Sequence, residues 1–138
     1  GIDAAGVNKV LFRTKSPTRL AMEARMVAAM ELYDNGRVVV MSIPLSLCRE
    51  LNASESDVED LSSLAALVQG TDCGITLREQ DPHRVKISVR TGKRVDASAV
   101  CRELGGGGHK GAAGAAVDGT MAEAKAAILA AYRKATGA

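Results

Sequence analysis

Aromatic side chains are scarce in this sequence of 138 residues, which has no Trp and contains only Phe12, Tyr33 and Tyr132. Proteins that hold single strands without sequence preference stack the bases on aromatic rings, and that mode is nearly excluded here. The formal net charge of +2 is also too small for the broad phosphate-tracking surface of a nonspecific duplex binder. Any contact with nucleic acid is therefore expected to be local.

Cysteine is scarce as well, and Cys48, Cys73 and Cys101 lie far apart in the sequence. An odd number of cysteines without a CxxC spacing predicts neither a disulfide framework nor a zinc site. We expect free thiols that pack as small apolar groups in a reducing cytoplasm. No apolar run approaches the roughly 18 residues of a membrane-spanning helix, and no signal segment opens the chain. A cytoplasmic protein without a membrane partner is expected.

Acidic and His residues are not grouped as a hydrolytic metal centre requires. The sequence contains no DxD or DHH motif and no other cluster of Asp with His. A two-metal site needs several such ligands, so we assign no catalytic residue and no metal ligand to the chain. The first residue is Gly1 instead of Met, which leads us to expect a further segment upstream.

The patterning of apolar residues predicts one α/β domain, with a mixed β-sheet of about five strands and helices packed on its faces. The composition, 46% hydrophobic and 25% charged residues, is that of an ordinary folded protein. Runs of β-branched and other apolar residues predict strands at 8–13, 37–43, 73–79, 84–90 and 114–117. Helical spacing and capping residues predict helices at 18–33, 44–51, 54–68, 96–104 and 120–134. Either Asp96 or Ser98 opens the fourth of these helices, and Thr120 caps the last.

The first predicted helix should bury one apolar stripe. Thr18 is placed to cap its N-terminus, and Asn35-Gly36 is placed to stop its C-terminus. The stripe consists of residues that recur at helical spacing, namely Leu20, Ala24, Val27, Ala28 and Leu32.

A glycine run lies between the predicted helix at 96–104 and the predicted strand at 114–117. It consists of Gly105, Gly106, Gly107 and Gly108, and His109 and Lys110 follow at once. Consecutive glycines allow positive φ and remove every Cβ that would keep a ligand away, so the amide N–H groups can point at an anion. His109 adds a hydrogen-bond donor and Lys110 a fixed positive charge. The run is therefore a candidate phosphate cradle.

Other interpretations of the glycine run were weighed. A GxGxxG fingerprint should follow a strand, and a Walker loop needs GxxxxGK[ST], so neither fits. A flexible linker is usually diluted with Ser and placed between domains, whereas this run lies inside the fold. The linker interpretation stays open, and it predicts that substitutions in the run leave binding unchanged.

Arg90 is a candidate for binding the same anion, because it ends the predicted strand at 84–90 and α/β folds place ligand contacts at strand ends. Lys93 and Arg94 follow shortly after it, and their charges favour a solvated surface. His83 lies in a polar turn without a partner pattern, and we expect it to be exposed.

These motifs resemble the DHH-associated substrate-binding domain, which follows the catalytic domain in DHH-family phosphoesterases such as oligoribonucleases, nucleotide phosphatases and RecJ-type exonucleases. Residues 105–114 match the pattern GGGGHxxAAG, and residues 85–90 match a strand that ends in Ser-hydrophobic-Arg. The resemblance covers nearly the whole chain. Residues 1–138 are therefore expected to form one C-terminal substrate-binding domain, with the catalytic DHH domain upstream. Thr91-Gly92 departs from the Ser and basic residue that often follow this Arg.

The resemblance implies that the glycine loop and His109 hold the phosphate or terminal nucleotide of a substrate, while Arg90 helps to fix it. The substrate would be a short RNA or DNA oligonucleotide or a nucleotide phosphate. Two manganese ions in the DHH domain of the same protein would support its hydrolysis, whereas this chain alone would hold no cofactor and be inactive. A homodimer is compatible with the resemblance. The substrate-binding residues that it implies are Arg90, Gly105, Gly106, Gly107, Gly108, His109 and Lys110.

Two other functions stay open from the sequence. A similar domain ends alanyl-tRNA synthetases, so the chain could be an RNA-binding module. A sensor of cyclic dinucleotides would use the same loop, usually within a membrane-anchored chain. Sequence upstream of Gly1 would separate these alternatives, since DHH-type metal motifs indicate the enzyme and an editing domain indicates the synthetase.

Overall fold

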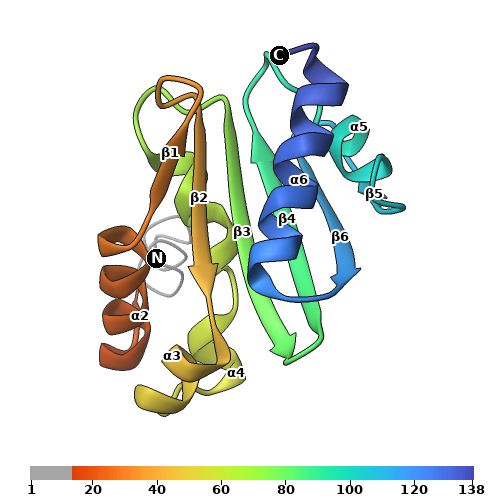
Figure 1. Ribbon diagram of the computed structural model, residues 1–138. Coiled ribbons are helices and arrows are strands. Elements are labelled where there is room, and N and C mark those ends of the chain that lie inside the picture. The colour runs from red at the N-terminus through yellow and green to blue at the C-terminus, as the bar shows by residue number, and fades with distance from the viewer. Residues whose placement is uncertain (1–13) are drawn as a thin grey trace, which may run out of the picture.

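A six-stranded mixed sheet in the order β1-β2-β3-β4-β6-β5 forms the centre of the computed structural model (Figure 1). The structure describes residues 14–138, and the strand expected at 8–13 lies outside them. The pair β2–β3 is parallel and the other pairs are antiparallel. The strands are β1 (Glu31–Tyr33), β2 (Val38–Ile43), β3 (Cys73–Asp81), β4 (Arg84–Thr91), β5 (Gly107–Gly108) and β6 (Ala112–Asp118).

The predicted α/β fold with a mixed sheet is confirmed. The strands expected at 37–43, 73–79, 84–90 and 114–117 correspond to β2, β3, β4 and β6, whereas β1 and β5 were not predicted. The helices are α2 (Pro17–Ala28), α3 (Leu45–Glu50), α4 (Glu55–Val58), the 3-10 helix η1 (Leu61–Leu67), α5 (Ala97–Arg102) and α6 (Met121–Thr136).

One face of the sheet is covered by α5 and α6. The alternate residues Val85, Ile87 and Val89 of β4 point to this face and are fully buried. They pack in one cluster with Ala97 of α5 and Ile128 of α6. The covered face therefore supplies the larger of the two hydrophobic clusters.

The opposite face is covered over only part of its width. Met22 and Met26 of α2, together with Leu61 of η1, pack there on Val39 and Met41 of β2. No buried residue of β4, β5 or β6 belongs to this second cluster. Among residues 14–138, the face is therefore covered over β2 and β3, η1 reaches the side of β4 at Arg90, and β6 carries no helix there.

The predicted course of the chain from Thr18 to Tyr33 is wrong in its second half. The helix ends at Ala28 and a separate strand follows at Glu31–Tyr33. Asn35-Gly36 forms the turn between β1 and β2, where Asp34, Asn35 and Gly36 all have positive φ. The N-cap is Ser16, whose side chain accepts a hydrogen bond from the N–H of Arg19.

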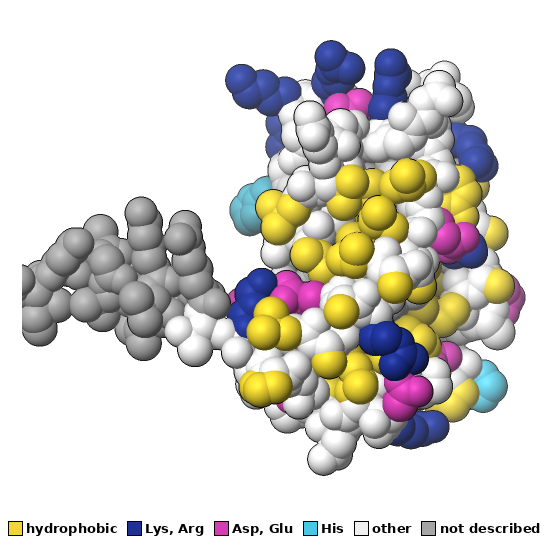
Figure 2. All heavy atoms as spheres, turned by 90° about the vertical axis from the view of Figure 1, so that its left-hand side faces the viewer, with side chains coloured by type: hydrophobic (Ala, Val, Ile, Leu, Met, Phe, Trp, Pro, Cys, Tyr) yellow, Lys and Arg dark blue, Asp and Glu magenta, His cyan; other side chains and the backbone are white. Residues whose placement is uncertain are grey.

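The predicted apolar stripe of this helix is wrong as well. The buried residues of α2 are Met22 and Met26. Leu20 and Val27 are 53% and 44% exposed, and Leu32 of β1 is 54% exposed. Figure 2, which views the molecule from the α2 side, shows hydrophobic side chains gathered on this surface.

The helix predicted at 54–68 is two short helices. Ser54 and Asp57 form a capping box at the start of α4, as the sequence indicated, but α4 ends at Val58. Asp60 then adopts a left-handed conformation with φ 65°, and η1 begins at Leu61. This break turns η1 toward β3 and β4.

Two of the three thiols are buried in the cluster beneath α5 and α6, as expected for small apolar groups. Burial raises the pKa of Cys73 to about 12 and that of Cys101 to about 11. Cys48 is only partly buried. Among residues 14–138, no helix is both long enough and apolar enough to span a bilayer.

Candidate anion-binding site

The uncovered face of β4, β6 and β5 gathers the residues that the sequence singled out. Directly opposed residues on neighbouring strands point to the same face. Arg90 pairs with Ala112, and Ala112 exchanges both backbone hydrogen bonds with His109. Two strand spacings thus separate the Cα atoms of Arg90 and His109, roughly 10 Å. Two rows of residues cross this face. The first row consists of Arg90, Ala112 and His109, and the second consists of Ser88, Gly114 and Gly107.

Arg90 is held from the side by η1. Its Nη2 donates to Oγ of Ser62 at 3.2 Å. Gly74, which pairs with Arg90 across β3 and β4, makes this contact possible. A Cβ at Gly74 would lie 2.5 Å from the backbone nitrogen of Ala66, so only glycine lets η1 approach the sheet so closely. Within residues 14–138, Arg90 has no carboxylate as an ion-pair partner.

The first half of the glycine run ends helix α5. The N–H of Gly105 donates to the carbonyl of Arg102 at 3.0 Å, and the N–H of Gly106 donates to the carbonyl of Cys101 at 2.9 Å. Gly105 has a left-handed φ of 80°. These are the features of a Schellman motif, which explains why the helix stops here.

The expectation that the amides of this run face a ligand is wrong for most of them. Besides Gly105 and Gly106, the N–H of His109 is engaged, donating to the carbonyl of Ala112 at 2.8 Å. Hydrogen-bonded and non-hydrogen-bonded pairs alternate in an antiparallel ladder, so Gly107 falls on a bonded pair and Gly108 on a non-bonded pair. The N–H of Gly108 therefore points away from β6. Positive φ is likewise limited to Gly105 and Gly108 within the run.

Gly106 and Gly108 are required by the packing of the hairpin that β5 forms with β6. A Cβ at Gly106 would lie 2.2 Å from the carbonyl oxygen of Gly114. A Cβ at Gly108 would lie 2.6 Å from the Cα of Ala113. Both glycines thus allow the backbone of β5 to lie against β6.

Gly107 differs from its neighbours, because a Cβ built on it would meet nothing within 4 Å. Its pairing with Gly114 directs that position to the uncovered face. With Gly114 it forms a flat floor beside the row of Arg90, Ala112 and His109. A phosphate bound along this row would meet backbone, and no side chain, on the flank that this floor provides.

The turn that carries His109 is anchored to the sheet. Oγ1 of Thr91 donates to the carbonyl of Lys110 at 3.0 Å, and the N–H of Ala97 donates to the same carbonyl at 2.7 Å. The Thr91 that departs from the family pattern thus has a structural role. The side chains of His109 and Lys110 are exposed, and so is His83, as expected.

Ser62, Lys86 and Ser88 were missed by the sequence analysis. Lys86 and Ser88 alternate with the buried residues Val85, Ile87 and Val89 along β4. This period of two predicts a polar face with Arg90 at its end. Ser62 could not be found this way, since it comes from η1 and reaches Arg90 only through the fold.

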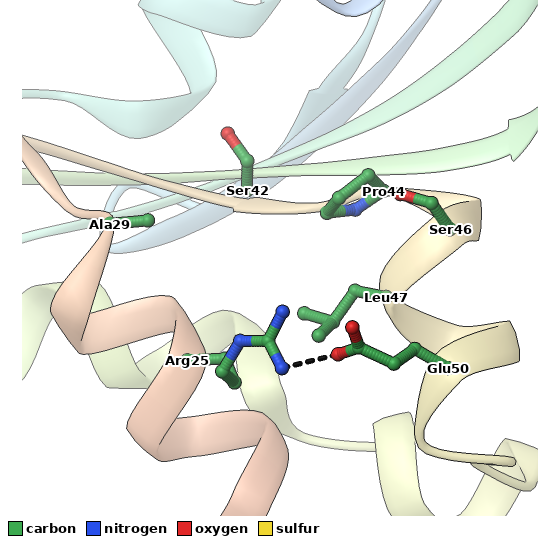
Figure 3. Close-up of a pocket in the computed structure, with 7 residues that line it drawn as sticks. All are labelled: Arg25, Ala29, Ser42, Pro44, Ser46, Leu47 and Glu50. Carbon is green, nitrogen blue, oxygen red and sulfur yellow. Dashed lines mark hydrogen bonds and ion pairs between the residues drawn. The ribbon is translucent and has the colours of Figure 1, made fainter.

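A separate hollow of about 240 Å³ lies between α2 and α3, at Leu47 and Pro44. Figure 3 shows Arg25 and Glu50 pointing toward one another across it and forming an ion pair. Because its charged groups neutralise each other, this hollow has no free cation for an anionic ligand.

Among residues 14–138, no group of three or more His, Cys, Asp or Glu residues is placed to hold a metal ion. Manganese, which the family resemblance implies for the catalytic domain, therefore does not fit residues 14–138, and no step through a metal is assigned to them.

The class of the protein is an α/β domain with a six-stranded mixed sheet, one face of which is covered only in part. Residues 35–137 match the family model of the DHHA1 domain, and the chain belongs to this family. It is 29% identical over 105 residues to the bifunctional oligoribonuclease and PAP phosphatase NrnA of Thermus thermophilus. The match covers 76% of this chain and 31% of that relative, so the chain spans about a third of the length of the relative.

Solved structures show the same fold. An exopolyphosphatase-related protein from Bacteroides fragilis superposes with a TM-score of 0.87 and 24% identity, over 99% of this chain and 40% of that one. The pGpG-specific phosphodiesterase PggH from Vibrio cholerae superposes with a TM-score of 0.59 and 12% identity, over 87% of this chain and 39% of that one. The C-Ala domain of Aquifex aeolicus alanyl-tRNA synthetase superposes with a TM-score of 0.50 and 14% identity, over 75% of this chain and 96% of that one.

Proposed function

We propose that this domain binds the phosphate and terminal nucleotide of a short oligonucleotide or nucleotide phosphate, on behalf of a DHH-family phosphoesterase. The observation that carries the proposal is the row of Arg90, Ala112 and His109 across an uncovered sheet face. Membership of the DHHA1 family and the similarity to NrnA support the choice of substrate class. Hydrolysis, with two manganese ions, is assigned to a catalytic DHH domain.

Each residue has a distinct role in the proposal. The guanidinium of Arg90, oriented by Ser62, donates to two phosphate oxygens. His109 donates from the other end of the row. Gly107 keeps the floor free of side chains, and Lys110, next to the exposed imidazole, adds positive charge. Gly105, Gly106 and Gly108 act indirectly, by shaping the hairpin.

An open sheet face binds weakly without a second wall. A few phosphate contacts made by one surface suggest a Kd on the order of 0.1 to 1 mM. The DHH domain of the same protein, lying over this face, would raise the affinity by enclosing the nucleotide. The chain by itself is expected to be inactive toward short RNA with manganese.

The test is titration of the 138-residue chain with the 5′-phosphorylated dinucleotide pApA, followed by amide chemical shifts. Shifts are expected at Gly108, His109 and the end of β4. Arg90→Ala and His109→Ala should each weaken binding at least tenfold, because a charge-assisted hydrogen bond contributes about 1.5 to 3 kcal/mol.

Arg84→Ala is the matched control for this titration. Arg84 is an Arg on the same strand and face, but it lies at the opposite end of β4 and is paired with Asp118. Its removal should leave affinity unchanged. No shift at millimolar pApA, or equal affinity in all variants, would contradict the proposed function and favour the linker interpretation.

A further inference from the structure

A hollow of about 260 Å³ lies next to Arg90, where α4 and η1 meet the sheet. It lies between the break that separates α4 from η1 and strands β3 and β4. Ser62 lines it and also accepts the hydrogen bond from Arg90, so the hollow continues directly from the proposed phosphate position. Its volume is below the roughly 300 to 1,000 Å³ of pockets for drug-sized ligands. A volume of this size suits a ligand group as small as one fused pair of rings.

The charges around this hollow do not suit a second phosphate. Three carboxylates, Glu55, Glu59 and Asp60, line it together with two cations, Arg78 and Lys86. Arg78 pairs with Glu55 at 2.8 Å. Glu59 and Asp60 form no ion pair within residues 14–138. The hollow thus offers free carboxylate acceptors, which repel an anion and attract N–H donors.

Donors and acceptors come from opposite walls. Glu59 and Asp60 belong to the break between α4 and η1, whereas Lys86 projects from β4, where it pairs with Arg78 of β3. Lys86 carries three N–H donors and has no carboxylate within 4.0 Å among the described residues. The strand wall therefore donates, and the loop wall accepts.

Asp60 has a backbone conformation that supports a role here. Its φ of 65° lies in the left-handed region, and as the residue before η1 its side chain makes no capping hydrogen bond. Non-glycine residues in this region carry a local cost and cluster at ligand sites. Asp60 lines the hollow, and its carboxylate has no ion-pair partner among residues 14–138.

We propose, building on the proposed function, that this hollow holds the nucleobase attached to the phosphate at Arg90, and that it selects guanine. The Watson–Crick edge of guanine carries two adjacent donors, N1–H and the 2-amino group, next to the acceptor O6. A carboxylate of the loop wall accepts from both donors, while Lys86 donates to O6. Adenine, cytosine and uracil present no pair of adjacent donors.

Apolar contacts complete the hollow without stacking on a ring. Ile43 and Val58 line it and are buried, and within residues 14–138 no aromatic side chain lines it. Selectivity therefore rests on the polar edge of the base, and loss of the carboxylates should remove it.

The test is the affinity of the 138-residue chain for guanosine, inosine and adenosine 5′-monophosphates. Inosine lacks only the 2-amino group of guanosine. GMP should bind about tenfold more tightly than AMP, with IMP between them, since each 1.4 kcal/mol corresponds to a factor of ten. The double variant Glu59→Gln/Asp60→Asn should bind GMP as weakly as AMP, with its affinity for AMP unchanged.

Glu50→Gln is the control, because Glu50 is an exposed carboxylate on α3 in the other hollow, and it should keep the preference for GMP. Equal affinity for GMP and AMP in the unaltered chain would overturn guanine selection, and so would a preference that survives the double variant. In either case Arg90→Ala still weakens every nucleotide if the proposed function holds. Absence of binding by all three nucleotides would instead overturn the proposed function.

Discussion

The two faces of β4 contrast in both composition and cover. Val85, Ile87 and Val89 are fully buried under α5 and α6. On the other face Lys86 is exposed and Ser88 is half-buried, and η1 reaches this face of β4 only from the side. The same strand thus stabilises the fold with one face and presents polar groups with the other. The difference separates residues whose substitution should unfold the protein from residues whose substitution should affect only binding.

The contrast is sharpest within the glycine run, where substitution of Gly106 should have the largest effect on the stability of the fold. Gly106→Val places a side chain against the carbonyl of Gly114 at a distance of 2.2 Å. It should destabilise the fold by on the order of 4 kcal/mol or more, among the largest effects of single substitutions. Gly107→Val meets open space, so the free energy of unfolding should change by less than about 1 kcal/mol.

Urea denaturation of both variants measures this difference, and pApA titration measures binding by the folded one. Gly107→Val should abolish detectable binding, because a branched side chain rises from the floor directly beside the row of Arg90, Ala112 and His109. A folded Gly106→Val would show that β5 need not lie against β6. Normal binding by Gly107→Val would remove the floor from the site.

The second comparison uses neighbouring residues of β4. Ile87→Ala deletes a fully buried side chain and should cost about 2 to 5 kcal/mol in the free energy of unfolding. Ser88→Ala changes a residue of the open face and should cost less than about 0.5 kcal/mol. Urea denaturation of both variants measures the two losses in the free energy of unfolding. Similar costs would mean that the polar face of β4 is covered after all.

The sequence predicted the covered face better than the open one. The alternation in residues 84–90 indicates which side chains of β4 point inward, and the capping residues Asp96 and Thr120 correctly mark the starts of α5 and α6. These are local signals. The contact of Ser62 with Arg90 depends on Gly74 and on the break at Asp60, which bring together segments remote in the sequence.

The helix α2 shows where local patterning fails. Both Met22 with Met26 and Leu20 with Val27 have helical spacing, so either side could face the sheet. Tertiary packing buries the methionines. The end of the helix was missed although Asn35-Gly36 between apolar runs is a strong hairpin signal, because the apolar spacing favoured one long helix to Tyr33.

The glycine run was identified as functional from its composition, but its four members have different roles. Gly105 caps a helix, and Gly106 and Gly108 allow close approach of two strands. Such roles depend on the backbone of Gly114 and Ala113 across the hairpin, which a single sequence does not reveal. Arg90 and His109, by contrast, both lie in the row that passes through Ala112, and their role in binding stays a prediction.

The smallest expected effect concerns the turn between β5 and β6, which carries His109. Thr91→Val removes the hydroxyl that donates to the carbonyl of Lys110 at 3.0 Å, while keeping the shape of the side chain. The loss of one neutral hydrogen bond should cost about 0.5 to 1.5 kcal/mol. Since His109 and Ala112 are hydrogen-bonded to each other within this hairpin, their amides should exchange faster with solvent, and affinity for pApA should fall a fewfold. Thr136→Val is the control, because its hydroxyl makes a similar bond to the carbonyl of Tyr132 on α6; it should lower stability without changing exchange at His109. Unchanged exchange in Thr91→Val would show that the Ala97 amide alone anchors the turn, and that the position of His109 does not depend on the residue that departs from the family pattern.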